Sequence, residues 1–220
     1  MSELFLRICS SLVLAALAIG VTWTGGMPYL LFWFAAAVLV LHEWVKMSGY
    51  RPLWLVAGIA YSSIFFAAML LLRNSPQGRT AILWLFGLIW AADSGAYFGG
   101  RLIGGPKLWP AVSPGKTWSG AIAGTMAGVA AGFAVIWAEG IAPHPMHGVV
   151  GFILVVAAQL GDLLESGIKR HFGVKDTGRL IPGHGGVMDR CDSLVAAAFV
   201  ALLLGALRML HAPAQGLLVW

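Results

Sequence analysis

The sequence predicts an all-α integral membrane protein, a polytopic helical bundle of about seven transmembrane helices. Of its 220 residues, 59% are hydrophobic and only 10% are charged, and the mean hydropathy is +0.84. A soluble domain carries about 25% charged residues, so a soluble globule of this composition would expose much of its apolar surface. The composition therefore excludes a soluble enzyme, and the apolar character and two cysteines also exclude a disordered chain and a disulfide scaffold.

Seven apolar segments approach the roughly 20 residues that cross a bilayer. They occupy residues 8–24, 28–45, 53–72, 80–99, 118–138, 147–165 and 193–210. The first two are separated by little more than Gly25 and Gly26, which predicts a tight helical hairpin.

The first segment has some features of a signal peptide. Arg7 precedes the apolar run, and Ala16-Leu17-Ala18 resembles a cleavage site. The run continues to Trp23, however, and this greater length favours a helix that is retained in the protein. Cys9 lies in this segment, far in sequence from Cys191, and nothing in the pattern supports a disulfide between them.

Basic residues predict the orientation, because Lys and Arg accumulate on the cytoplasmic side of a membrane protein. Seven spans place eleven basic residues on the side of the N-terminus: Arg7, Lys46, Arg51, Arg101, Lys107, Lys116, Lys169, Arg170, Lys175, Arg179 and Arg190. Only Arg73, Arg79 and Arg208 fall on the other side. We therefore expect a multi-pass protein of the inner (plasma) membrane with a cytoplasmic N-terminus.

Acidic residues gather at the same face of the membrane. Asp93 lies in the fourth segment, Asp162 and Glu165 lie in the sixth, and Asp189 and Asp192 precede the seventh. A charge at the centre of a span costs about 2.5–3.5 kcal/mol, and such residues are usually functional. Salt bridges at helix ends are the alternative, but they explain poorly why both signs of charge are dense between residues 162 and 192. The sequence therefore predicts N-terminal helices in residues 1–80 and a catalytic half in 81–220, with cytoplasmic loops at 100–117 and 166–192.

The spacing of these residues predicts a metal site. Asp162, Glu165, Ser166 and Lys169 stand at i, i+3, i+4 and i+7, so they share one helical face. An ion pair between Glu165 and Lys169 would leave Asp162 without a cation. Carboxylates from two helices that meet at one membrane face form an all-oxygen site of the kind that Mg²⁺ prefers.

Two further segments have features of phosphate sites. Several glycines lie between Phe172 and Val187, with Lys175, Arg179 and Arg190 around them, and such glycines allow backbone N–H groups to approach an anion. Lys116 and Thr117 directly precede the fifth segment, where a helix N-terminus can bind phosphate. Simple capping by Ser113 or Thr117 is an equal alternative there. His144 and His147 are interpreted as surface residues.

Residues 90–192 resemble the bacterial phosphatidate cytidylyltransferases, also called CDP-diacylglycerol synthases. The signature runs through S-x-x-K-R-x-x-x-x-K-D from Ser166, P-G-H-G-G from Pro182 and D-R-x-D from Asp189. Upstream motifs of the family occur in the same order: D-S-G-A-Y from Asp93, S-P-G-K-T-W from Ser113 and G-D-L-x-E-S from Gly161.

The chain departs from the family pattern in two respects. Ser119 stands where the family usually has Glu, directly after Trp118. The chain is also shorter than typical members, which carry more hydrophobic sequence before the signature. The number of N-terminal helices and any homodimer contact that they make therefore stay open.

The resemblance implies transfer of CMP from CTP to phosphatidic acid, giving CDP-diacylglycerol and pyrophosphate, with CTP entering from the cytoplasm and the lipid from the membrane. It implies that Asp162, Asp189 and Asp192 hold Mg²⁺, with a second metal or a monovalent cation as a further option. Together with Lys169 and Arg170, these aspartates are the expected catalytic residues. The expected substrate-binding residues are Asp93, Ser113, Lys116, Thr117, Glu165, Ser166, Lys175, Asp176, His184, Gly185, Gly186 and Arg190.

Three other functions compete with this interpretation. A CTP-dependent lipid kinase of the polyprenol or dolichol type would release CDP instead of pyrophosphate. An ion or phosphate transporter would also use intramembrane acids, but it tends to have repeated halves and midplane sites, and neither is evident here. An inactive scaffold would retain the fold, yet the intact signature disfavours it.

Overall fold

A computed structural model describes residues 3–178, 180–181 and 185–220, with side chains from Cys9 onward. This part of the chain forms eight helices and one two-stranded hairpin. The elements are α1 (Glu3–Thr24), α2 (Gly26–Ser48), α3 (Pro52–Asn74), α4 (Gly78–Ile103), β1 (Lys107–Trp109), β2 (Ser113–Thr117), α5 (Trp118–Ala138), α6 (Pro145–His171), α7 (Met188–Arg208) and α8 (Pro213–Leu218).

The predicted helical membrane bundle is confirmed. The first six apolar segments each fall within one helix from α1 to α6, and the seventh, 193–210, runs two residues past the end of α7 at Arg208. α2 to α7 are six helices that are long and apolar enough to cross a membrane. The apolar part of α1 is shorter, from Cys9 to Thr24. The expected hairpin between α1 and α2 is also present, and Gly25 and Gly26 adopt positive φ angles of 66° and 56° in its turn. A count of seven spans and a cytoplasmic N-terminus stay predictions.

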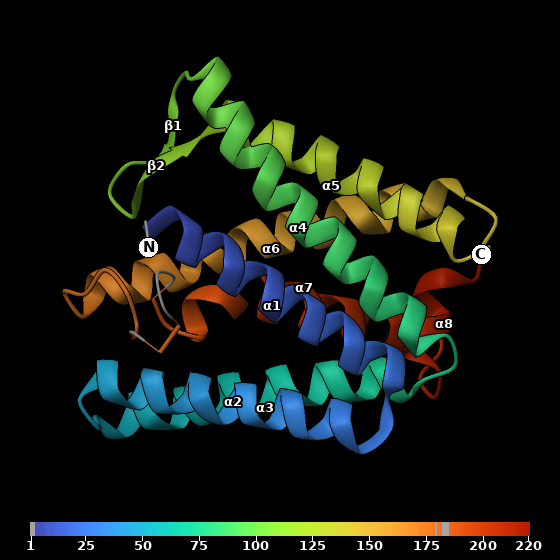
Figure 1. Ribbon diagram of the computed structural model, residues 1–220, viewed down its shortest axis with the longest axis horizontal. Coiled ribbons are helices and arrows are strands. Elements are labelled where there is room, and N and C mark those ends of the chain that lie inside the picture. Colours follow the sequence, from blue (N-terminus) through green and yellow to red (C-terminus); the bar gives the residue numbers. More distant parts are fainter. Residues whose placement is uncertain (1–2, 179, 182–184) are drawn as a thin grey trace.

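The helices form three groups (Figure 1). α2 and α3 pack along one side of the bundle, α4 and α5 pack along the other, and α6 and α7 pair with each other. α7 also contacts α2, α3 and α4. The core is aromatic and aliphatic, with Trp33, Phe65, Trp84, Leu88 and Leu154 buried. The hairpin and the α6–α7 connection lie at one end of the bundle, and α8 lies at the other.

The loop expected at residues 100–117 contains a β-hairpin that the sequence did not predict. Gly104 and Gly105 have φ angles of 68° and 98°, which end α4 and reverse the chain direction. β1 and β2 then pair antiparallel, with Lys107 opposite Thr117. The strands are three and five residues long, too short to stand out as alternating patterns.

The interpretation of His147 as a surface residue is wrong. Its side chain is 3% exposed, its Nε2 lies 2.9 Å from the carbonyl oxygen of Leu218, and its Nδ1 accepts from the His144 N–H. The reason is α8, which packs on the end of α7 and on the start of α6 and covers this position. Cys9 and Cys191 are both free thiols.

A row of glycines allows α5 to pack closely on α4. Gly120, Gly124, Gly128 and Gly132 recur every four residues and are all buried. A Cβ atom added at Gly128 would lie 2.7 Å from the carbonyl oxygen of Leu88 and 2.8 Å from a Val155 methyl carbon. Small residues at such spacing permit close backbone approach between membrane helices.

We therefore predict that Gly128→Ala destabilises the protein. Alanine is the better helix former by about 0.5–1 kcal/mol, but the overpacking it causes here should cost about 1–3 kcal/mol. Thermal unfolding in detergent provides the measurement. Gly20→Ala is the matched control, because a Cβ at Gly20 has no atom within 4 Å in the described structure. A midpoint that rises for both variants would contradict the packing argument.

Candidate active site

A charged cavity of about 770 Å³ lies at the end of the bundle that carries the hairpin. Its wall is built from α4, the hairpin, α5, α6, the α6–α7 connection and the start of α7. The charged residues that line it are Asp93, Arg101, Lys107, Lys116, Asp162, Lys169, Asp176, Asp189, Arg190 and Asp192. Basic and acidic side chains are thus equally numerous in a space large enough for a nucleotide.

Three carboxylates form the acidic cluster of this site. Asp162, Glu165 and Asp192 each offer an oxygen, and these atoms lie within 4.8 Å of one another. Glu165 is 2% exposed, and its Oε1 has no hydrogen-bond partner among the described residues. Negative oxygens this close repel one another unless a cation or a shared proton lies between them. The donor set fits a hard divalent cation, which prefers carboxylate oxygen.

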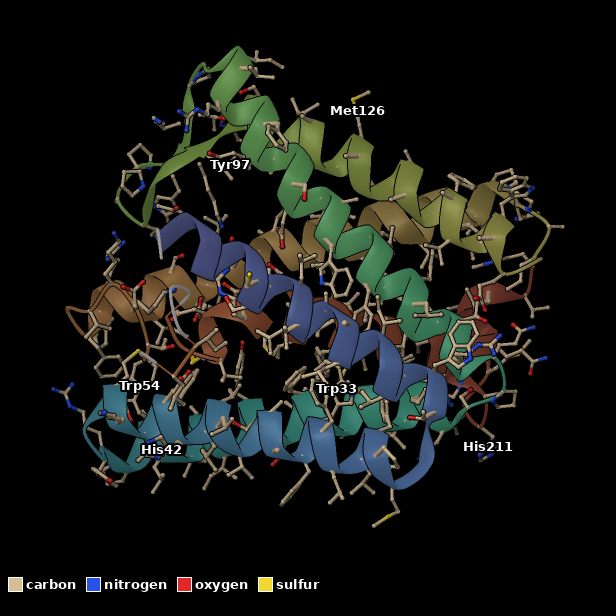
Figure 2. The ribbon with its side chains drawn as sticks, in the orientation of Figure 1. Trp33, His42, Trp54, Tyr97, Met126 and His211 are labelled. Carbon is tan, nitrogen blue, oxygen red and sulfur yellow. The ribbon has the colours of Figure 1, made fainter. Side chains whose placement is uncertain are left out.

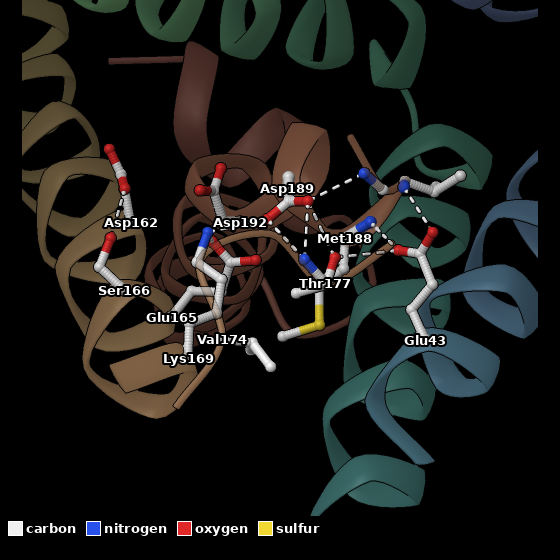
Figure 3. A network of polar contacts seen from close by, with 12 residues as sticks. Glu43, Asp162, Glu165, Ser166, Lys169, Val174, Thr177, Met188, Asp189 and Asp192 are labelled. Carbon is white, nitrogen blue, oxygen red and sulfur yellow. Dashed lines mark hydrogen bonds and ion pairs between the residues drawn. The ribbon is translucent and has the colours of Figure 1, made fainter. Parts of the chain in front are cut away.

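Lys169 joins this cluster to the start of α7 (Figure 3). Its ammonium group lies 3.0 Å from Glu165 Oε2 and 2.8 Å from Asp189 Oδ1. Asp189 also accepts from the backbone N–H groups of Thr177, at 3.0 Å, and Gly186, at 2.8 Å. Charge-assisted bonds of this kind are strong and short, so the lysine and the loop hold the Asp189 carboxylate in a fixed position.

Of the two roles that the sequence left open for Lys116 and Thr117, the structure shows capping, and phosphate binding stays a prediction. Thr117 caps α5, since its Oγ1 accepts from the Gly120 N–H at 3.1 Å. The ammonium of Lys116 instead lies 2.5 Å from Asp162 Oδ2, across the cavity wall. Ser119 bonds to the hydroxyl of Thr117 and to the carbonyl of Gly104, and thereby ties the end of α4 to the start of α5.

The predicted site residues fall into three groups. Those that line the cavity are Asp93, Lys116, Thr117, Asp162, Lys169, Asp176, Asp189, Arg190 and Asp192. Glu165, Ser166, Gly185 and Gly186 lie beside them; the Ser166 hydroxyl, for example, is 3.4 Å from Asp162 Oδ1. Ser113 lies in β2, Lys175 is exposed, and exposed Arg170 donates to the carbonyl of Val174. His184 and Arg179 lie outside the described residues.

Sequence reasoning missed Glu43, which α2 brings to the α6–α7 connection. Its carboxylate is 1% exposed and accepts from the N–H groups of Val187 and Met188 and from the hydroxyl of Thr177. A signal was available, because Glu43 is the one acidic residue in the apolar segment 28–45. Tyr97, Arg101, Lys107 and Gln159 also line the cavity and were not among the predicted site residues.

An apolar groove of about 1060 Å³ adjoins the charged cavity. It lies between α5 and α6 beneath the hairpin, and its wall includes Trp118, Val129, Phe152 and Leu163. Met126, another wall residue, projects outward from α5 (Figure 2). Leu108, Ala121 and Gln159 line both the groove and the cavity. A molecule with a charged head and apolar chains could therefore occupy both.

Comparison with known proteins finds one family model and several curated relatives. The model described as "Cytidylyltransferase family" matches residues 51–207. A phosphatidate cytidylyltransferase of Brucella suis is 37% identical, covering 94% of this chain and 95% of the relative. The Rickettsia bellii protein of the same name is 34% identical, covering 94% of this chain and 92% of the relative. The Haemophilus influenzae protein of that name is 42% identical, covering 75% of this chain and 62% of the relative.

The network around Lys169 predicts a large effect of its removal on stability. Lys169→Met would leave the nearly buried carboxylates of Glu165 and Asp189 without their shared cation, which should cost about 3–5 kcal/mol. The measurement is thermal unfolding in detergent. Arg79→Met is the control, because it breaks an ion pair with Glu139 in which the arginine is 45% exposed and should cost about 1 kcal/mol or less. Equal destabilisation by both variants would contradict this account.

Proposed function

The chain belongs to the cytidylyltransferase family, and from that membership we propose that it is a phosphatidate cytidylyltransferase. It is a nucleotidyltransferase of phospholipid synthesis that transfers CMP from CTP to phosphatidate and yields CDP-diacylglycerol and pyrophosphate. One observation carries the proposal beyond the relatives' names: the charged cavity and the apolar groove share three wall residues. The reaction needs such a junction, because one substrate is a water-soluble nucleotide and the other is a lipid.

The reaction exchanges one phosphorus–oxygen bond for another. An oxygen of the phosphatidate phosphate attacks the α-phosphorus of CTP, and the bond from that phosphorus to the β-phosphate bridging oxygen breaks. The electron pair leaves with pyrophosphate. The attacking group is already an anion, so the chain need not supply a general base. Catalysis then consists mainly of holding two anions in line and neutralising their charge.

Basic residues on both sides of the cavity support this role. Arg101, Lys107 and Lys116 come from α4 and the hairpin, and Lys169 and Arg190 come from α6 and α7. We assign Lys116 to the phosphate of the lipid and Arg190 to the triphosphate of CTP. Lys116 would exchange its contact with Asp162 for one with phosphate when substrate enters.

The acidic cluster is the proposed magnesium site. Asp162 and Asp192 were predicted as ligands from the sequence, and Glu165 joins them with an Oε1 that has no hydrogen-bond partner in the described part of the chain. Bound there, Mg²⁺ would neutralise charge on the phosphate oxygens. Asp189, the other expected ligand, is held by Lys169, Thr177 and Gly186, and its direct coordination of metal stays a prediction.

The apolar groove is the proposed seat of the acyl chains. Gln159 stands at its border with the cavity and donates to the Ala121 carbonyl at 3.1 Å and the Thr125 hydroxyl at 3.2 Å. The glycerol backbone and ester groups of phosphatidate would pass this amide. Trp109 and Trp118, both exposed near the groove, suit the interface between lipid and water where tryptophan is enriched. Because the basic residues that line the cavity belong to the side on which most Lys and Arg are expected, we place the site at the cytoplasmic face of the inner membrane. A homodimer stays a prediction.

Product analysis distinguishes this function from the lipid kinase. With CTP labelled at the α-phosphate, we expect label in the lipid, and with label at the γ-phosphate, we expect it in pyrophosphate. EDTA should abolish the formation of both labelled products. Asp162→Asn should lower turnover by about 100-fold or more, because it removes a proposed metal ligand. Glu139→Gln, at the far end of the bundle, is the matched control. Label from the γ-phosphate in the lipid would establish a kinase instead.

Filling the groove should impair use of long-chain lipid selectively. Val129→Phe adds bulk to the wall of the groove. The KM for dipalmitoyl phosphatidate should rise about 10-fold, because its long chains lose buried methylenes that contribute about 0.8 kcal/mol each. The KM for a dihexanoyl substrate should change little, because its short chains bury few methylenes. Steady-state kinetics in detergent provide the measurement. Val56→Phe, on the exposed surface of α3, is the control. An equal rise for both chain lengths would contradict the groove as the acyl site.

A further inference from the structure

We propose that Glu43 is a positioning residue for cytidylyl transfer: it fixes the end of the α6–α7 connection and thereby sets the place of Asp189 and Lys169. The inference rests on the proposed function and adds to it a residue from outside the signature. Glu43 does not line the charged cavity, so any effect that it has on turnover must act through other residues.

Glu43 supplies the cap that α7 lacks. Val187 occupies the N-cap position and makes no side-chain capping bond. The backbone N–H of Val187 lies 3.0 Å from Glu43 Oε1, and that of Met188 lies 2.8 Å from Oε2. The first N–H groups of a helix need acceptors, and a negative charge at this end is favourable. A helix far away in the sequence thus anchors the turn that precedes Asp189.

Thr177 connects Glu43 directly to Asp189. Its hydroxyl lies 3.2 Å from Glu43 Oε2 and 3.0 Å from Asp189 Oδ2 (Figure 3). A hydroxyl has one proton for donation, so the two carboxylates share a single donor. The backbone N–H of Thr177 donates to Asp189 as well. A shift of Glu43 therefore moves both the N-terminus of α7 and the residue that orients Asp189.

The surrounding backbone is shaped to admit the Glu43 carboxylate. A Cβ atom added at Gly178 would contact its Oε1, and one added at Gly186 would contact its Oε2 and the Thr177 hydroxyl. Both glycines belong to the glycine-rich stretch that the sequence suggested as a phosphate cradle. At Gly178 and Gly186, the missing side chain makes room for Glu43.

Lys169 connects the position of Asp189 to the acidic cluster. Asp189 is the next residue after Met188, and its Oδ1 lies 2.8 Å from the Lys169 ammonium. Lys169 in turn contacts Glu165 of the acidic cluster at 3.0 Å. A misplacement of about 1 Å at such groups can cost on the order of 100-fold in rate, even when both substrates still bind.

The test compares five variants with the wild type in one CDP-diacylglycerol assay: Glu43→Gln, Thr177→Val, Thr177→Ser, the double variant E43Q/T177V, and Glu139→Gln. Glu43→Gln places an amide NH₂ among donors, and we expect kcat to fall about 10-fold to 100-fold with KM for CTP and phosphatidate within about twofold of wild type. The kcat of Thr177→Val should fall by a similar factor. Thr177→Ser should keep the wild-type kcat, because serine retains the hydroxyl. The double variant should be no slower than the slower single variant, because both substitutions act by displacing the same group, Asp189.

Glu139→Gln is the matched control, because Glu139 accepts from the Thr80 hydroxyl at 2.7 Å and links two helices at the opposite end of the bundle. It should lower the thermal midpoint and leave kcat unchanged. Each of three results would overturn the proposal. They are a wild-type kcat for Glu43→Gln, an equal loss of kcat in Thr177→Ser and Thr177→Val, and a loss of kcat in the double variant that equals the product of the two single losses. If Glu43→Gln does not fold, the Thr177 pair decides the question. An inactive wild type would overturn the proposed function itself.

Discussion

The structure depends on how an apolar bundle accommodates charge. Ten charged side chains line one cavity at the end of helices that are otherwise almost entirely hydrophobic. Charge in such a place is costly unless it is paired, and Lys169 pairs two carboxylates from two helices at once. The position of α6 against α7 at this end is therefore set by the same contacts that form the site. The pairing is incomplete at Glu165 Oε1, which has no hydrogen-bond partner among the described residues.

The boundary between the N-terminal helices and the catalytic half is less sharp in space than in sequence. The family model begins at residue 51, after α2 ends. Glu43 of α2 nevertheless accepts from the start of α7, and Tyr61 of α3 lies beside Trp44 with ring centroids 5.2 Å apart. α2, which lies before the matched region, thus contacts the start of α7 directly through Glu43.

Local patterns predicted most of the helices and much of the site. Hydropathy located α1 to α7, because each buries or presents to lipid a long apolar stretch, and the i, i+3, i+4 spacing placed Asp162, Glu165 and Ser166 on one face of α6. Long-range contacts were not predictable in this way. The capping of α7 by Glu43 joins residues 145 positions apart, and His147 is buried only because α8 returns to it. The short β1–β2 hairpin forms where glycines reverse the chain, and hydropathy gives no sign of it.

The central claim is that Asp162, Glu165 and Asp192 hold the divalent metal beside the nucleotide. The most direct measurement is a crystal structure with Mn²⁺ and a nonhydrolysable CTP analogue, in which the anomalous signal locates the metal. The account predicts an anomalous peak bounded by these three carboxylates, with the α-phosphate of the analogue next to it. A peak outside the acidic cluster, or a nucleotide bound elsewhere than in the charged cavity, would contradict it.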